Sequence, residues 1–119
     1  MSNTVAARET GFEPGKGSAY DYLPQWMDIP GLKETEGQES PLAVVKLFHP
    51  LSGWTWYVVE ADDKGDICFG LVSGFAVEYG YFSIAELRSV DVVLPVERDL
   101  TFEPTPVREV ERALGRGPR

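Results

Sequence analysis

Carboxylates are the side chains of this sequence best suited to chemistry. Glu97 and Asp99 flank Arg98 in the string LPVERDLTF, and alternate residues of an extended segment point to one face. Paired acids can act as general acid and base or hold Mg²⁺, and Glu60 could join them in space. No lysine accompanies them as in a D-x-K nuclease pattern, so we prefer a structural interpretation. In it, Arg98 pairs with a carboxylate and pins the last strand or helix to the sheet.

Metal ligands and nucleophiles are scarce. His49 and Cys68 are the single histidine and cysteine, and their separation does not match zinc-ligand spacing. We interpret His49 as a surface or turn residue and Cys68 as a small core residue. A G-x-S-x-G elbow is absent, and the acidic run at 62–66 is typical of a turn rather than an EF-hand. The sequence predicts no catalytic residue, metal or cofactor, and we expect a protein that is not an enzyme.

Aromatic side chains are the other candidates for a site, because aromatic residues and arginines anchor many interfaces. Most of them are expected to pack in the core, and the rest to contact a protein. Between Lys46 and Arg88 only Lys64 is basic. Aromatic residues that stack on nucleic-acid bases are usually accompanied by basic side chains that attract the phosphates, and these are missing here. The predicted interaction patch consists of Trp26, Trp54, Trp56, Tyr57, Tyr81, Arg108 and Arg112.

The elements that position these residues are mainly strands. Alternating apolar residues and turn signals predict strands over 43–48, 54–61, 67–72 and 78–82, with a further extended segment over 94–102. Both faces of 54–61 are apolar, so this strand is expected to be central. Asp62 to Asp66, with Gly65, predicts a hairpin turn. The expected fold is α+β, a twisted and mostly antiparallel sheet of four to five strands with two short helices.

Two helices are predicted from their caps. Ser83 and Glu86 form a capping-box pattern that begins a short helix over 83–89. Thr105 followed by Pro106 predicts an N-cap with proline at the first helical position, and the helix runs to Leu114. Arginines recur every four residues along this helix, and we take them for a solvated face, with phosphate or an acidic partner as the alternative: Arg108, Arg112 and Arg116.

The chain is predicted to form one domain. Residues 1–19 are expected to be a disordered or loosely packed arm, residues 20–114 a single α+β domain, and residues 115–119 a frayed tail. The segment YDYLPQWMDIP at 20–30 is too apolar for a free tail. We expect it to fold back and pack its aromatics on the domain, with a docking peptide for another protein as the alternative.

Charge and composition exclude several classes of protein. The net charge is −8, and residues 1–103 alone carry −10, so direct nucleic-acid binding by the acidic body is disfavoured. One cysteine permits no intramolecular disulfide, and no apolar run could serve as a signal or membrane segment. We expect a cytoplasmic protein without membrane contact, either a monomer or a small homo-oligomer.

Several uncommon strings occur together in one order, namely KLFHP, GWTWYVVEAD, FGLVSGFAVEYGYFSIAEL and LPVERDLTFEPTP. They cover roughly Lys46 to Pro106, and together they resemble domain-of-unknown-function family 2958. The resemblance implies an accessory protein carried by plasmids, phages or integrative elements, and it implies no activity, cofactor or catalytic residue. His49 stands where the family usually has threonine, and Ala76 and Val77 stand where an acidic or polar pair is common.

Three functional hypotheses follow. The first is a non-enzymatic accessory protein of bacterial mobile DNA that acts by contact with an unidentified protein partner. The second is an anti-defence protein whose acidic surface mimics DNA and occupies a restriction or nuclease complex. The third, from a different class, is a magnesium-dependent enzyme acting on nucleic acid through Glu97 and Asp99, with Glu60 as an optional third ligand.

Overall fold

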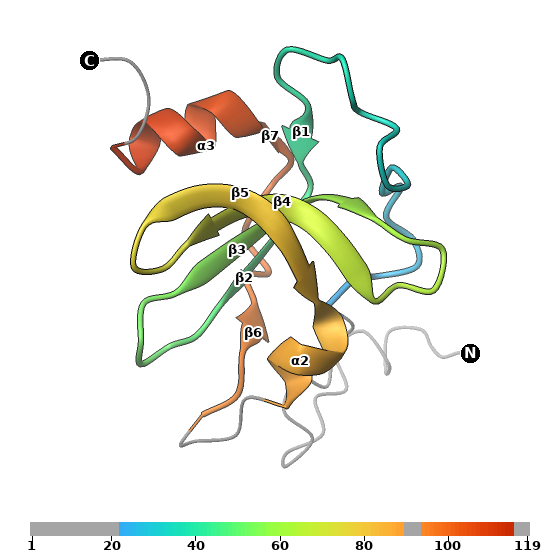
Figure 1. Cartoon of the computed structure of the whole chain (residues 1–119). Helices are drawn as coiled ribbons and strands as arrows, with labels where there is room; N and C mark the ends of the chain where they lie inside the picture. Colours follow the sequence, from blue (N-terminus) through green and yellow to red (C-terminus); the bar gives the residue numbers. More distant parts are fainter. Residues whose placement is uncertain (1–21, 90–93, 116–119) are drawn as a thin grey trace.

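A five-stranded antiparallel sheet forms the centre of the computed structural model, which describes residues 22–89 and 94–115 (Figure 1). Its spatial order is β5 (Val77–Ser83), β4 (Ile67–Ser73), β3 (Thr55–Ala61), β2 (Val45–Phe48) and β6 (Glu97–Arg98). A small second sheet pairs β1 (Leu42–Ala43) with β7 (Thr105–Pro106), and the two short helices are α2 (Ile84–Arg88) and α3 (Val107–Ala113). The predicted α+β fold is confirmed.

β3 is the middle strand, and both of its faces are buried, as its apolar pattern predicts. Trp56 and Val58 belong to one hydrophobic cluster, whereas Tyr57 and Val59 belong to another. α2 packs on the first side of the sheet, here called the α2 face, and α3 packs on the other, the α3 face (Figure 1). Alternation along β3 therefore supplies two cores at once.

A β-bulge interrupts that alternation near the end of β3. Val58 pairs with Gly70 and Glu60 pairs with Phe69, so Val59 is an extra residue in β3. An extra residue puts two consecutive side chains on the same face of the sheet. Glu60 therefore lies on the α3 face together with Val59, although strict alternation would place it on the α2 face beside Val58.

The segment that precedes the sheet packs on the α2 face. Tyr22 is 1% exposed, and its hydroxyl donates a hydrogen bond to the backbone carbonyl of Val96. Leu23, Met27 and Ile29 pack against the same cluster. The prediction that this segment folds back is right for Tyr22 but wrong for Trp26, which is 65% exposed. Tyr20 and Asp21 lie outside the described residues.

The cap of α2 is partly as predicted. The Ser83 hydroxyl accepts a hydrogen bond from the Glu86 backbone N–H, as in a capping box. The carboxylate of the cap comes from Asp66 rather than Glu86, because Asp66 Oδ1 accepts from the Ser83 hydroxyl and from the Ala85 N–H. The turn before β4 therefore also fixes the start of this helix.

The predicted N-cap of the last helix is wrong. Thr105 pairs with Ala43 in the β1–β7 ribbon, and its hydroxyl donates to the Glu103 carbonyl. Pro106, with φ −52° and ψ 128°, is the residue that precedes α3. Pairing with β1 keeps both residues extended, so the helix begins one position later, at Val107.

The extended segment predicted over 94–102 forms a strand over only part of its length. Within the described residues it pairs only at Glu97–Arg98, because Asp99 begins a turn in which its carbonyl accepts from the Phe102 N–H at 3.2 Å. The strand predicted over 43–48 is divided at Val44 between the two sheets. None of the described helices is long and apolar enough to span a bilayer.

Candidate interaction surface

The acidic candidates lie in two separate places. Glu97 is level with Phe48, and Phe48 is level with Thr55 on β3. Glu60 lies five residues farther along β3, which at about 3.3 Å per residue is roughly 16 Å. One ion cannot span that distance, since carboxylate–magnesium bonds are about 2.1 Å long. Among residues 22–89 and 94–115, no group of three His, Cys, Asp or Glu side chains could hold a metal.

Asp99 holds a turn and a neighbouring strand. Its carboxylate accepts from the Thr101 hydroxyl at 2.7 Å and the Thr101 N–H at 2.9 Å, and it lies 3.6 Å from the Lys46 ammonium. The Thr101 hydroxyl, above all, lowers the pKa of Asp99, and Lys46 adds to the effect. Lys46 also lies 5.9 Å from the centroid of the Tyr57 ring. These contacts describe an anchor for the turn after β6.

Glu60 anchors the loop that follows Pro30. The carboxylate is 3% exposed and accepts from the Lys33 N–H at 2.7 Å, the Thr35 N–H at 3.0 Å and the Thr35 hydroxyl. Burial raises the pKa of Glu60, but the hydrogen bonds from Thr35 and Lys33 outweigh it, so the pKa lies below its ordinary value. Lys33 is held at φ 71°, a conformation uncommon for residues with a side chain.

His49 and Cys68 are both buried. His49 Nδ1 accepts from the Ser52 N–H at 3.1 Å, and Nε2 lies 3.0 Å from the Leu94 carbonyl oxygen. The imidazole therefore joins a turn to a distant segment, and it is buried rather than on the surface. Burial raises the pKa of Cys68 to about 12, so this thiol stays protonated at neutral pH.

The predicted aromatic patch is divided by the sheet. Trp56 and Tyr57 are buried on opposite faces, and Trp26 is exposed on the segment before the sheet. Arg108 and Arg112 are exposed on α3, and Arg116 lies outside the described residues. The seven residues therefore do not form one surface. Two smaller sites, both on the β4–β5 hairpin, contain some of them.

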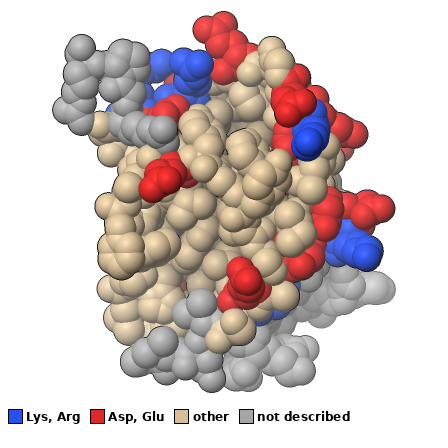
Figure 2. Space-filling model, in the orientation of Figure 1, with Lys and Arg blue, Asp and Glu red and all other residues tan. Residues whose placement is uncertain are grey.

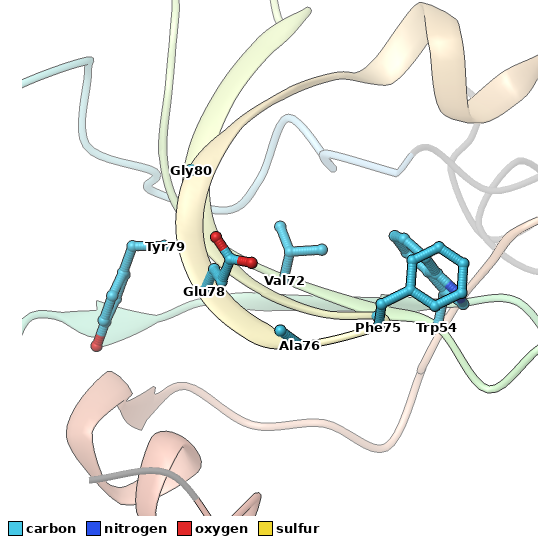
Figure 3. A pocket seen from close by; sticks show the side chains of 8 residues that line it. Trp54, Val72, Phe75, Ala76, Glu78, Tyr79 and Gly80 are labelled. Atoms are coloured by element: carbon cyan, nitrogen blue, oxygen red, sulfur yellow. The ribbon is translucent and has the colours of Figure 1, made fainter.

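The first site is a hollow on the α2 face near the tip of this hairpin, with a volume of about 270 Å³. Phe75 is 98% exposed, and its ring meets the Trp54 ring edge to face at 5.1 Å between centroids. Figure 3 shows these two rings at one end of the hollow and the Glu78 carboxylate toward the other. The Phe75 hollow, as we call it, is lined chiefly by Trp54, Val72, Phe75, Ala76, Glu78 and Gly80.

Two glycines shape the Phe75 hollow. A Cβ atom on Gly74 would lie 2.5 Å from the Trp54 ring, so a side chain there would displace the ring that supports Phe75. A Cβ atom on Gly80 would meet no atom within 4 Å. The open space over Gly80 is therefore the floor of the hollow, and it could be filled without a steric clash.

The second site is a groove on the α3 face, with a volume of about 340 Å³. The loop of residues 33–41 forms one wall, and the start of α3, with Arg108, borders it. Aromatic side chains of β4 and β5 form the other wall: Phe69, Tyr79 and Tyr81. We call it the Tyr81 groove. It brings together three residues singled out from the sequence, Glu60, Tyr81 and Arg108.

The face that carries β5 is largely uncharged. Figure 2 shows a broad area without Lys, Arg, Asp or Glu in the middle of this view, with acidic and basic side chains mainly at its margins. Large apolar residues of the β4–β5 hairpin that are exposed are Ile67, Phe75, Tyr79 and Tyr81. The sequence interpretation missed Phe75, although an aromatic residue between two short strands, in the string SGFA, is a detectable signal.

Comparison with known proteins gives one result. The model of a family described as "Protein of unknown function (DUF2958)" matches residues 27–109. Comparison with curated proteins found no match, and comparison with solved structures found none either. The matched range contains the whole five-stranded sheet, the Phe75 hollow and the Tyr81 groove.

Proposed function

The chain belongs to the DUF2958 family, whose function is unknown, and from its own residues we propose that it is a non-enzymatic protein that acts by contact with another protein. The proposed contact point is the tip of the β4–β5 hairpin, with Phe75 as its anchor. The observation that carries this proposal is the 98% exposure of Phe75.

Phe75 differs from an ordinary exposed apolar residue because its ring contacts a second aromatic ring. The Trp54 ring supports it at 5.1 Å, and Trp54 in turn lies 6.1 Å from the buried Trp56. A ring contact that favours one orientation of the side chain reduces the conformational freedom lost on binding. Full burial of a phenylalanine contributes roughly 1.5–3 kcal/mol, so it could dominate a small interface.

The surroundings of Phe75 support a protein partner rather than nucleic acid. The surface seen in Figure 2, where β5 lies in front, is mostly uncharged. Among the residues that line the Phe75 hollow, Glu78 is the one with a charged side chain. Phosphate backbones require basic side chains. An apolar patch with a polar margin is the usual composition of a protein interface.

Photo-crosslinking in the bacterial cell tests this proposal. Benzoylphenylalanine would replace Phe75 in one variant and Leu100, which is 58% exposed near β6, in a matched variant. We expect a discrete crosslinked protein from position 75 that is absent from position 100. The change Gly80→Val, which fills the floor of the hollow, should reduce the same crosslink. Identical products from both positions, or no product from position 75, would contradict the proposal.

The setting of the protein is a separate part of the proposal. We infer from the family resemblance that it is an accessory protein of bacterial mobile DNA, active in the cytoplasm. Genomic neighbours from plasmids, phages or integrative elements would support this inference, and a consistent position among housekeeping genes would contradict it.

The two alternative functions, DNA mimicry and magnesium-dependent catalysis, differ in how well the structure supports them. DNA mimicry stays a prediction from the charge of −10 over residues 1–103, and it requires carboxylates gathered on one surface. Protection of incoming phage DNA would favour it. The magnesium enzyme loses Glu60 as a third ligand, because Glu60 is far from Glu97 and is already bound by Lys33 and Thr35. Asp99, a member of the main pair, is engaged by Thr101 and Lys46.

A further inference from the structure

The Tyr81 groove contains a buried negative charge for which residues 22–89 and 94–115 supply no recorded ion pair. The carboxylate of Glu60 accepts from two backbone amides and one hydroxyl, and each of these donors is uncharged. Lys33 contributes its backbone N–H rather than its ammonium group. Hydrogen bonds of this kind satisfy the oxygen atoms but leave the net charge uncompensated.

The opposite wall of the groove is aromatic. The Phe69 and Tyr79 rings are stacked, with their centroids 6.1 Å apart and an interplanar angle of 15°. Tyr81, which is 58% exposed, packs against Phe69 at 5.1 Å. The face of an aromatic ring attracts a cation, most strongly where water is partly excluded.

The charges around the groove favour a cationic occupant. Glu36, Glu39 and Glu60 border it, against Lys33 and Arg108. An anion entering the groove would approach the Glu60 carboxylate, whereas a cation would compensate it. The charge of −10 over residues 1–103 also attracts basic partners over a longer range.

We propose that the Tyr81 groove binds a basic side chain, arginine or lysine, presented by an exposed segment of a partner protein. The cationic group lies against the Tyr81 ring and faces the Glu60 carboxylate, while its aliphatic stem covers Phe69. Glu36 and Glu39 contact the flanking basic residues of the segment. This site is on the opposite face of the sheet from the Phe75 hollow, so the two proposals can fail separately.

A synthetic peptide tests the proposal directly. The probe is a fluorescein-labelled peptide with four arginines spaced by glycine and serine, and its control has citrulline, which is uncharged and nearly isosteric, at the same four positions. Binding to the full chain is measured by fluorescence anisotropy at low and physiological salt. We expect the arginine peptide to bind at least about 10-fold more tightly than the citrulline peptide.

Matched variants place the peptide in the groove. Tyr81→Ala and Glu39→Gln should each weaken binding about 3- to 10-fold. Trp26→Ala removes an exposed aromatic ring outside the groove, and Glu86→Gln removes an exposed carboxylate outside it. Each should change the affinity for the arginine peptide less than about 2-fold. Phe75→Ala should also leave it unchanged, because that ring lines the other hollow.

Several results would overturn the proposal. Equal losses from Glu39→Gln and Glu86→Gln would show attraction by overall charge only. Unchanged binding in Tyr81→Ala, or loss of binding in Phe75→Ala alone, would place the peptide elsewhere. Thermal stabilisation by inorganic phosphate, without binding of the arginine peptide, would identify the groove as an anion site. Glu60→Gln is not used as the main test because it also disturbs the loop of residues 33–41.

Discussion

The Phe75 hollow and the Tyr81 groove lie on opposite faces of the same two strands, but they differ in chemistry. Only one carboxylate, that of Glu78, borders the hollow, whereas five side chains with full charges border the groove. The hollow offers an aromatic ring to solvent, and the groove encloses a buried carboxylate beside aromatic rings. Alternation along one hairpin can thus produce an apolar contact site on one face and a site for charge recognition on the other.

The largest expected effect comes from Gly70, which pairs with Gly80 of the Phe75 hollow. A Cβ atom on Gly70 would lie 1.8 Å from the Tyr57 carbonyl oxygen, and backbone atoms cannot move aside cheaply. We expect Gly70→Ala to reduce the free energy of unfolding by more than about 3 kcal/mol, as measured by urea denaturation. Its partner Gly80→Ala is the matched control, and equal effects of the two changes would contradict the geometry.

Glu60 should distinguish the two sites most clearly. Glu60→Gln removes the charge that binds the loop of residues 33–41 and should lower the free energy of unfolding by about 2 kcal/mol. Hydrogen exchange should speed up at the amides of Lys33 and Thr35, while the crosslink from position 75 remains. If that crosslink disappears in a variant that is still folded, the two sites are coupled.

The same carboxylate gives a pH dependence with a defined sign. Because the pKa of folded Glu60 lies below its ordinary value of 4.5, its ionised form stabilises the fold fully above that value. The stabilisation is lost as the pH falls through the lower, folded pKa. The difference in unfolding free energy between wild type and Glu60→Gln should therefore be constant near neutral pH and shrink below about pH 4.5. A difference that grows on acidification would show that the pKa shift has the opposite sign.

The smallest effects on stability are expected at the Phe75 hollow. Gly80→Ala should stabilise the fold by about 0.5 kcal/mol, because alanine restricts the unfolded chain and meets no atom within 4 Å. Phe75→Ala should change stability by less than about 0.5 kcal/mol, since the ring is exposed. Thermal melting measures both. A loss of more than about 1 kcal/mol in either variant would mean that the hollow is filled in the folded protein.

The sheet could be predicted because its signals are local. Alternating apolar residues mark 54–61 as a strand covered on both faces, and the turn that follows has Gly65 at φ 72°, as a hairpin turn requires. Thr105 is an instructive failure. Its sequence context is that of an N-cap, but pairing with Ala43, a residue far away in the chain, gives the backbone a competing partner.

The candidate site was harder to predict because it depends on tertiary structure. Glu60, Tyr81 and Arg108 come from three distant elements, and only the packing of α3 and the loop of residues 33–41 brings them to one groove. No local sequence pattern predicts the extra residue, Val59, in β3. Sequence reasoning grouped Glu60 with Glu97 and Asp99 because all three are acids, whereas the strand register separates them.

Val59 makes the position of the acidic group depend on where the strand register shifts. If the pairing stayed regular and Val59 lay opposite Phe69, Glu60 would lie opposite Cys68 and its carboxylate would turn toward α2, away from Thr35 and Lys33. The loop would lose its attachment and the groove its anion, although no amino acid had changed. Deletion of Val59, in contrast, would leave Glu60 opposite Phe69 and remove one buried side chain from the core on the α3 face.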